Sequence, residues 1–209
     1  MNYIEMLKES AEKYSSIVCL GLDPVIEDIP EKDGTPGERI FKFYENILNA
    51  IVKKNIYPGA VKPNYAFYAQ YGIDGITSLE KVLTIYKNAG IPVILDYKRG
   101  DIGKTAAAYA KEAFDFFKAD AVTLSPYLGY DSIEPYIKGY PDKGYYILTK
   151  TSNASSGEIQ DVRGHGQAFP FADQHHPSRH AAMNERDQES RPSGLRLSPY
   201  GQHSIGCPA

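Results

Sequence analysis

The stretch IPVILDYKRGDIGKT, residues 91–105, places an apolar run directly before two carboxylates and two cations. IPVILD has the length and composition of a buried strand, and residues 103–118 carry apolar side chains at helical spacing. A buried strand followed by an amphipathic helix is the repeating unit of parallel sheets covered by helices. Asp96, Lys98 and Asp101 therefore gather where a strand of such a sheet ends.

The same order of strand and helix recurs along the chain. Expected strands are SIVCLGLD (16–23), PGAVKPN (58–64), IPVILD (91–96), DAVTLS (120–125) and GYYILTK (144–150). Capping boxes at Thr35 and Thr77 predict the starts of two helices, and two more are expected near 103–118 and 131–138. No glycine fingerprint follows the first strand, so a dinucleotide-binding sheet is disfavoured and a (β/α)8 TIM barrel is predicted.

The predicted barrel is incomplete after its fifth strand. Five strand–helix units use the residues up to 162, whereas such barrels typically run to about 250 residues. Residues 163–209 contain no Lys, no Val and all five His, and the apolar periodicity stops there. We expect two parts: 1–162, the first five units of the barrel, and 163–209, an atypical tail that is frameshifted or disordered. Under the frameshift hypothesis, another reading frame of the DNA encodes a GxG-containing barrel end.

Composition argues against several classes of function. A formal net charge of −3 gives no reason to expect binding to nucleic acid or to a membrane surface. No apolar run of 18 residues and no charged-then-apolar leader occur, so neither a membrane span nor a signal peptide is expected. Two cysteines make neither a disulfide framework nor a metal cluster. These features predict a cytoplasmic protein.

In a parallel barrel, functional side chains lie at the C-terminal ends of the strands and in the loops that follow. The residues that this rule selects, strand by strand, are Asp23, Lys62, Asp96 with Lys98 and Asp101, Ser125, and Ser152. Polar residues at strand ends also serve simply to solvate loops. An alternation of Asp and Lys over three strands exceeds that need, and it predicts a reaction centre at this rim.

The setting of Lys98 limits what it can do. A lysine that acts as a Schiff-base nucleophile must be neutral, whereas nearby carboxylates favour the charged ammonium. Lys98 is therefore suited to donating a proton and to stabilising negative charge that develops beside it. Metal binding by Asp96 and Asp101 is the competing reading. An ammonium between the two carboxylates and the absence of His before residue 165 argue against it, so no metal ligand is assigned.

Four motifs in order resemble orotidine 5′-phosphate decarboxylases, and most closely their longer bacterial branch. They are GLDP (21–24), VKPNYAFY (61–68), Asp96-x-Lys98-x-x-Asp101-Ile102 and SPYLGYDS (125–132), and the resemblance covers residues 1 to about 162. It implies decarboxylation of orotidine 5′-monophosphate to UMP without a cofactor, by a homodimer with sites at its interface. The Asp-x-Lys-x-x-Asp motif also occurs in related sugar-phosphate decarboxylases and synthases, some of which use magnesium.

The resemblance also implies a role for each matching residue. The catalytic residues would be Lys98, Asp96, Lys62 and Asp101. Lys98 would protonate C6 of the pyrimidine as CO2 leaves, Asp96 would lie against the leaving carboxylate, and Lys62 would complete the charged network. The substrate-binding residues would be Asp23 and Lys62 at the ribose hydroxyls, Asp101 and Thr105 at the partner's substrate, and Ser152 at the pyrimidine edge.

Two alternatives remain beside this reading. One is a metal-dependent sugar-phosphate lyase of the same superfamily. The other is an inactive truncated fragment, because the glycine-rich stretch and arginine that hold the phosphate in the family are not recognisable in 163–209. Phosphate binding at a distance can supply energy that drives chemistry, so severely reduced turnover is expected of the chain as written.

Overall fold

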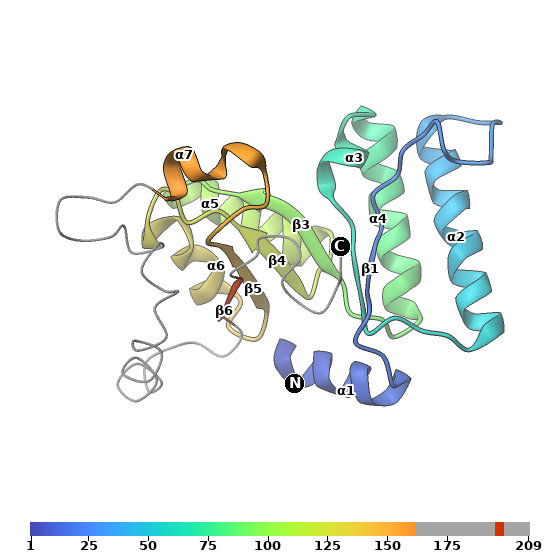
Figure 1. The fold of residues 1–209 in the computed structure, drawn as a ribbon, viewed down its shortest axis with the longest axis horizontal. Helices are drawn as coiled ribbons and strands as arrows, with labels where there is room; N and C mark the ends of the chain where they lie inside the picture. The colour runs from blue at the N-terminus through green and yellow to red at the C-terminus, as the bar shows by residue number, and fades with distance from the viewer. Residues whose placement is uncertain (162–194, 199–209) are drawn as a thin grey trace.

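The computed structural model describes residues 1–161 and the backbone of residues 195–198. The predicted division at residue 162, the tail and its five histidines thus lie almost wholly outside the described residues. Within them the strands are β1 (Cys19–Gly21), β2 (Ala60–Lys62), β3 (Ile94–Arg99), β4 (Ala121–Leu124), β5 (Gly144–Leu148) and β6 (Leu195–Ser198). Each of the five predicted apolar runs contributes a strand (Figure 1).

Every strand pairs in parallel with its neighbour in the chain. β1 pairs with β2, and β3 to β6 form a sheet in chain order. Two isolated parallel bridges, Val61 to Val93 and Asn64 to Asp96, connect β2 to β3. A doubly wound sheet reverses its strand order at a switch point, whereas chain order throughout is the winding of a (β/α) barrel. The predicted fold class is confirmed.

β6 extends the sheet beyond the five strands expected from the sequence. It pairs with β5 from Tyr145↔Leu195 to Leu148↔Ser198. LRLS alternates apolar and polar residues, but a run of four residues without a neighbouring helical pattern is too short to predict a strand. Among the described residues, no strand pairing joins β6 to β1, so the barrel is open at this point. The described strands thus form a parallel but incomplete barrel.

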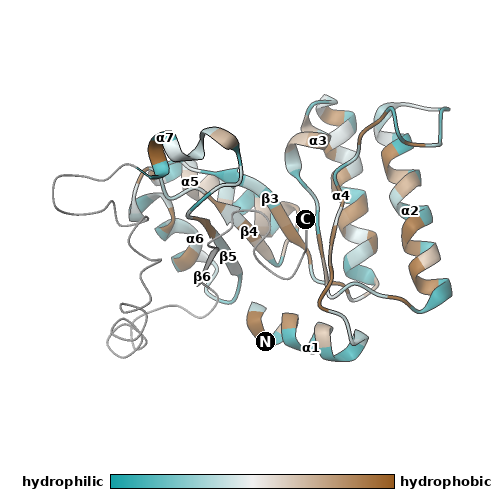
Figure 2. Cartoon of the chain, in the orientation of Figure 1, coloured by the Kyte–Doolittle hydropathy of each residue, from teal (hydrophilic) through white to brown (hydrophobic). Residues whose placement is uncertain are grey.

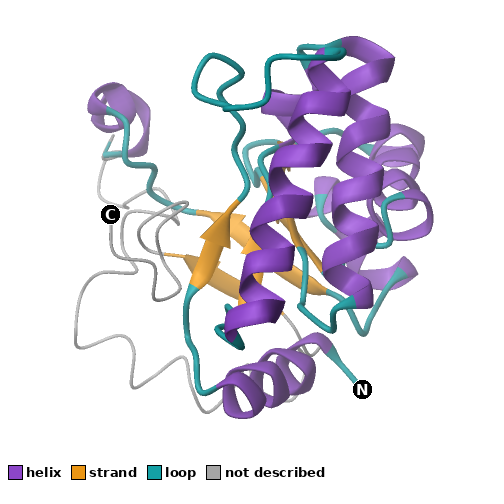
Figure 3. Cartoon of the chain, turned by 90° about the vertical axis from the view of Figure 1, so that its right-hand side faces the viewer, coloured by secondary structure: helices purple, strands orange, loops and turns teal. Residues whose placement is uncertain are grey.

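Helices cover the strands, as Figures 1 and 3 show. The α-helices are α1 (Tyr3–Tyr14), α2 (Pro36–Lys54), α3 (Tyr65–Ala69), α4 (Gly72–Asn88), α5 (Gly103–Lys111), α6 (Glu134–Gly139) and α7 (Gly157–Gln160). A π-helical turn η1 (Glu112–Phe116) continues α5, and 3₁₀ turns η2 (Tyr130–Ser132) and η3 (Ala154–Ser156) precede α6 and α7. Apolar and polar residues alternate around α2 and α4 in Figure 2, as expected of amphipathic helices. None of the helices in the described part of the chain is long and apolar enough to cross a membrane.

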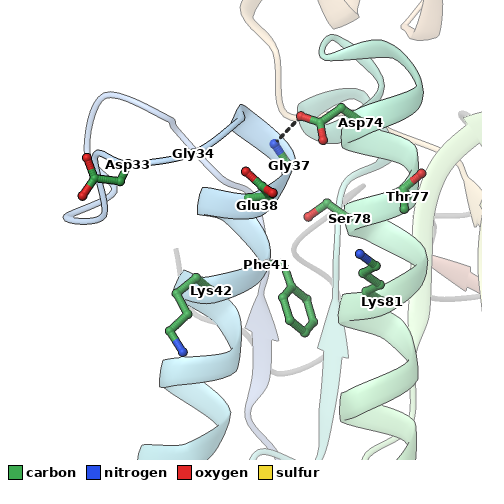
Figure 4. Close-up of a pocket in the computed structure, with 10 residues that line it drawn as sticks. All are labelled: Asp33, Gly34, Gly37, Glu38, Phe41, Lys42, Asp74, Thr77, Ser78 and Lys81. Carbon is green, nitrogen blue, oxygen red and sulfur yellow. Dashed lines mark hydrogen bonds between the residues drawn. The ribbon is translucent and has the colours of Figure 1, made fainter.

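The predicted start of α2 is confirmed, whereas that of α4 is wrong. Thr35 caps α2 through a complete capping box with Glu38. α4 begins at Gly72, five residues before the capping box expected at Thr77. The first turn of α4 is held by tertiary contacts instead, because Asp74 accepts hydrogen bonds from the Thr35 hydroxyl (2.9 Å) and from the backbone N–H of Gly37 (2.6 Å), as Figure 4 shows for the latter.

The N-terminal helix α1, which the sequence patterns did not predict, closes the lower end of the sheet in Figure 1. The Tyr3 ring packs in a cluster with Ala60, Ile94 and Ala121, the first residues of β2, β3 and β4, and with Tyr146 in the middle of β5. Its hydroxyl is 2.7 Å from that of Tyr146, and its N–H donates to the carbonyl of Asp142 (2.8 Å). The opposite, C-terminal end of the strands remains open for a site.

Candidate active site

Asp96 occupies the centre of the charged rim. Its side chain is fully buried, and its Oδ2 accepts a hydrogen bond from Lys62 Nζ at 3.0 Å. Its Oδ1 accepts from Lys98 Nζ at 2.7 Å and from the Thr123 hydroxyl at 2.8 Å. The carboxylate is thus held by two ammonium groups and a hydroxyl.

β3 does not end at Asp96, as the sequence suggested, but continues to Arg99 through a bulge. Leu95 pairs with Val122 and Arg99 with Leu124. Between these two pairs, three residues of β3 lie opposite a single residue of β4, Thr123. The backbone N–H groups of Tyr97 and Lys98 both donate to Thr123 Oγ1, at 3.1 and 3.0 Å. One hydroxyl therefore takes the place of the backbone carbonyls that these two N–H groups would meet in a regular strand pair.

Lys98 lies at the point of this bulge with φ of +47°. A left-handed conformation at a non-glycine residue costs on the order of 1–3 kcal/mol, and it persists where the surrounding structure enforces it. The bulge directs the Lys98 side chain back toward Asp96, so that the two residues of one strand form an ion pair. The Lys98 side chain remains 29% exposed, so it is partly accessible to solvent.

Asp23 and Lys62 bring the first two strands into the same cluster. The Asp23 carboxylate follows β1 and accepts a hydrogen bond from the N–H of Asn64, after β2, at 2.9 Å. Lys62, at the end of β2, reaches across to Asp96 on β3. The C-terminal ends of three neighbouring strands thus contribute alternating charges, in agreement with the predicted juxtaposition.

The surroundings of the cluster shift the pKa values of its residues so that the charged form is favoured at Asp96 and Lys62 and disfavoured at Asp23. Burial opposes ionisation of Asp96, but Lys62 and Lys98 outweigh it and hold the pKa of Asp96 below its ordinary value. Burial opposes the charge on Lys62, yet the carboxylates of Asp96 and Asp23 raise the pKa of Lys62 above its usual range. Loss of water from around Asp23 raises its pKa, and Lys62 and the Asn64 N–H only partly offset this effect.

No hydrogen bond or ion pair in the described residues joins the other three candidates, Asp101, Thr105 and Ser152, to this cluster. Asp101 is half-buried, and its Oδ1 accepts a hydrogen bond from the N–H of its neighbour Ile102 at 2.8 Å. Thr105, on α5, and Ser152, after β5, are exposed. The described structure therefore joins Asp23, Lys62, Asp96 and Lys98, and the roles expected for the other three remain predictions.

Thr123 is the functional position that the sequence reasoning missed. It lies inside the apolar run DAVTLS of β4 and was counted as part of a strand. A hydroxyl within a buried strand next to a charged one is a usable signal, because a buried hydroxyl requires hydrogen-bond partners. Asn64, at the end of the second predicted strand, donates its backbone N–H to Asp23, a contact that the sequence does not predict.

A separate groove of about 450 Å³ lies between α2 and α4, away from the cluster. Figure 4 shows side chains of both helices around it, including Glu38, Phe41, Ser78 and Lys81. Glu38 belongs to the capping box of α2, and Asp74 at its upper end anchors α4. We assign this groove to helix packing and not to chemistry.

The cluster is suited to reactions that leave an electron pair beside Lys98. Its ammonium is oriented by Asp96 and exposed on one side, so it can donate a proton to a carbanion. Asp96, buried and ionised, would repel a second carboxylate placed against it, and Lys62 balances its charge. Fold and site together define a (β/α)-barrel protein with an ammonium–carboxylate centre at the C-terminal ends of its strands.

The comparisons with known proteins agree with this assignment. The profile of the Orotidine 5′-phosphate decarboxylase / HUMPS family matches residues 16–186, which extends past the boundary predicted at 162. The chain belongs to this family. It is 44% identical over 163 residues to an orotidine 5′-phosphate decarboxylase of Roseiflexus castenholzii, covering 78% of this chain and 58% of the relative. A Ralstonia nicotianae enzyme of the same name is 41% identical over 169 residues, covering 80% and 60%.

Solved structures show the same fold. The structure of Leishmania donovani OMP decarboxylase superposes with a TM-score of 0.73 and 33% identity, covering 95% of this chain and 70% of that one. The UMP synthase of the same organism superposes equally well, with 33% identity and a TM-score of 0.73, over 39% of its chain. The chain spans about three fifths of the length of the curated relatives that it matches.

Proposed function

We propose that this chain acts on orotidine 5′-monophosphate, decarboxylating it to UMP in pyrimidine biosynthesis without a cofactor. The observation that carries the proposal is the buried Asp96 carboxylate held between Lys62 and Lys98 at the C-terminal rim of a parallel barrel. Membership of the decarboxylase family supports the same reaction.

In the proposed mechanism, the substrate carboxylate lies against Asp96 and the C6 atom faces Lys98. The C6–carboxylate bond breaks, CO2 departs, and the electron pair left on C6 takes a proton from the Lys98 ammonium. Lys62 and Asp23 hold the ribose hydroxyls, and Ser152 contacts the pyrimidine. Because the ammonium is already in place and oriented, it stabilises the developing charge without reorganisation.

We also propose a cytoplasmic homodimer in which Asp101 and Thr105 reach the partner's substrate. Large apolar side chains near the rim support an interface there, because they are exposed in the single chain: Ile102, Tyr127, Leu128 and Tyr130. The division into a barrel part, 1–162, and a tail, 163–209, belongs to the same proposal.

The direct test measures CO2 release from carboxyl-labelled orotidine 5′-monophosphate by the purified chain, with and without a chelator. We expect turnover that the chelator does not change. Lys98→Ala should lower it by about 10²–10⁴-fold, the usual contribution of a general acid. Lys104→Ala removes an exposed lysine of α5 and serves as the control. Turnover that survives Lys98→Ala would refute the assigned role, and turnover that the chelator abolishes would favour the metal-dependent lyase.

A non-catalytic fragment is the second candidate, because the chain spans only about three fifths of its curated relatives. A thermal melt with and without UMP separates the two. A ligand that binds the folded chain raises its melting temperature. An upward shift without turnover would support a binding-competent but inactive fragment.

A further inference from the structure

Arg99, the last residue of β3, is enclosed by aromatic rings on the outer side of the strand. Its guanidinium carbon lies 4.4 Å from the ring centre of Tyr109 on α5, 4.8 Å from that of Tyr65 on α3 and 5.2 Å from that of Tyr97 on β3. Distances below about 6 Å are those of attractive cation–π contacts. Three elements thus converge on one side chain.

Ring contacts, together with polar interactions of its side chain with Tyr65 and Glu112, fix the position of this guanidinium. Its Nη2 lies 3.6 Å from Glu112 Oε2 on the π-helical turn η1, an ion-pair distance that exceeds a normal hydrogen bond. The buried Arg99 Nε has no hydrogen-bond partner in the described structure. A lysine could replace the charge but not the planar stacking.

The enclosure adjoins the bulge that shapes the reaction centre. Arg99 is the residue at which pairing with β4 resumes, opposite Leu124, and its carbonyl accepts the N–H of Ser125 at 2.8 Å. On the other side of Lys98, the Tyr97 hydroxyl is 3.2 Å from both the Tyr109 carbonyl and the Tyr136 hydroxyl. Both neighbours of Lys98 are therefore fastened to the helical layer, while Lys98 itself faces Asp96.

We propose that Arg99 is a positioning residue: the clamp of Tyr65, Tyr97 and Tyr109 around it holds the bulge of β3, and so fixes the Lys98 ammonium against Asp96. Lys98 adopts a left-handed backbone that an unrestrained lysine rarely keeps. Fastening the residues on either side enforces this conformation. The inference rests on the proposed function only for the consequence that turnover depends on the clamp.

Amide hydrogen exchange, read by NMR, tests the clamp without requiring turnover. In the unaltered chain the N–H groups of Tyr97 and Lys98 should exchange slowly, because both donate to Thr123. Arg99→Gln and Tyr109→Leu should accelerate both amides at least ten-fold relative to the amides of α2. Tyr109→Phe keeps the ring and should exchange like the original chain, and Lys111→Gln removes an exposed cation of α5 as the charge-matched control.

Each outcome decides the proposal. Equal acceleration in α2 and at the bulge would show that Arg99 serves only global stability, and rapid exchange of Lys98 in the original chain would show that no clamp exists. Where turnover is measurable, Arg99→Gln should lower kcat at least ten-fold and change KM less than two-fold. Absence of both CO2 release and a UMP-induced melting shift would refute the proposed function, while the exchange data still decide the role of Arg99.

Discussion

Thr123 combines two tasks in a single side chain. Its hydroxyl oxygen accepts the N–H groups of Tyr97 and Lys98 and donates its own proton to Asp96. The hydroxyl therefore replaces the broken ladder at the bulge and fixes the carboxylate that faces the substrate. A side chain without a hydroxyl could fill the same space but could do neither.

We expect Thr123→Val to destabilise the fold by about 1–3 kcal/mol for each buried N–H that it leaves without a partner. Urea denaturation, followed by circular dichroism, measures this loss. Thr123→Ser retains the hydroxyl and should cost about 1 kcal/mol, the effect of one buried methyl group. Equal losses in the two variants would show that the hydroxyl contributes nothing.

Asp23 should carry a cost to stability at neutral pH. Its pKa is raised in the folded state, chiefly by loss of water around the carboxylate, so folding is less favourable once the group ionises. The cost is absent below the unfolded pKa of about 3.9, grows as pH rises toward the folded pKa, and is constant above it. Because Asp23 is an exposed residue, water screens its charge and the effect should be small: Asp23→Asn should raise the urea midpoint slightly at pH 7 and leave it unchanged near pH 3.

Asp96 should show the opposite dependence of folding stability on pH, and it therefore provides an internal comparison for Asp23. Its pKa is lowered, so the stability that it contributes is present above the unfolded pKa and is lost as pH falls through the folded pKa. A gain from Asp23→Asn that persisted at pH 3 would contradict the raised pKa of Asp23. Loss of activity in the same variant would be consistent with its proposed contact with ribose.

At the scale of elements, α1 depends on the glycine that begins β5. A Cβ built at Gly144 would lie 2.2 Å from the Tyr3 ring, which real side chains cannot tolerate. Gly144→Ala should therefore displace α1 and destabilise the fold by about 1–3 kcal/mol, the usual cost of overpacking. Gly139→Ala, at the end of α6 where a Cβ meets nothing within 4 Å, is the control. Matching urea midpoints for the two variants would contradict the close contact.

Local signals predicted the elements that depend on local chemistry. Apolar runs located five strands, and the capping box at Thr35 located α2, because both signals lie within a few residues. The start of α4 was not predicted correctly, because Asp74 in its first turn is bound by residues at the start of α2, almost forty positions earlier. The bulge at Lys98 was not predicted for the same reason, because its N–H groups are bound by a hydroxyl on another strand, β4.

The candidate site was predictable as a set of charges and not as a geometry. The rule that strand ends of a parallel barrel meet at one rim brought Asp23, Lys62 and Asp96 together before any coordinates. It could not show that Asp96 is fully buried or that Lys98 belongs to the strand. Those features depend on register, which is set by pairing between strands.

At the scale of the whole molecule, the chain carries the charged centre but only three fifths of the length of its curated relatives. A chimera that joins residues 1–161 to the remaining C-terminal part of the Roseiflexus castenholzii relative should turn over orotidine 5′-monophosphate about 10²-fold faster or more. Misplacing a substrate by about 1 Å can lower the rate by about 10²-fold, so completing the barrel should restore a factor of that size. Equal rates for chimera and original chain would show that the charged centre alone suffices.

The closure of the lower end by Tyr3 has a consequence for synthesis in the cell. The ribosome releases Tyr3 well before Tyr146, which lies 143 residues later in the chain and whose hydroxyl contacts that of Tyr3. At bacterial and eukaryotic elongation rates the delay is roughly 7–30 s. Ala60 and Ile94 of the same cluster are available to α1 earlier, whereas the Tyr3–Tyr146 contact can form only after this interval.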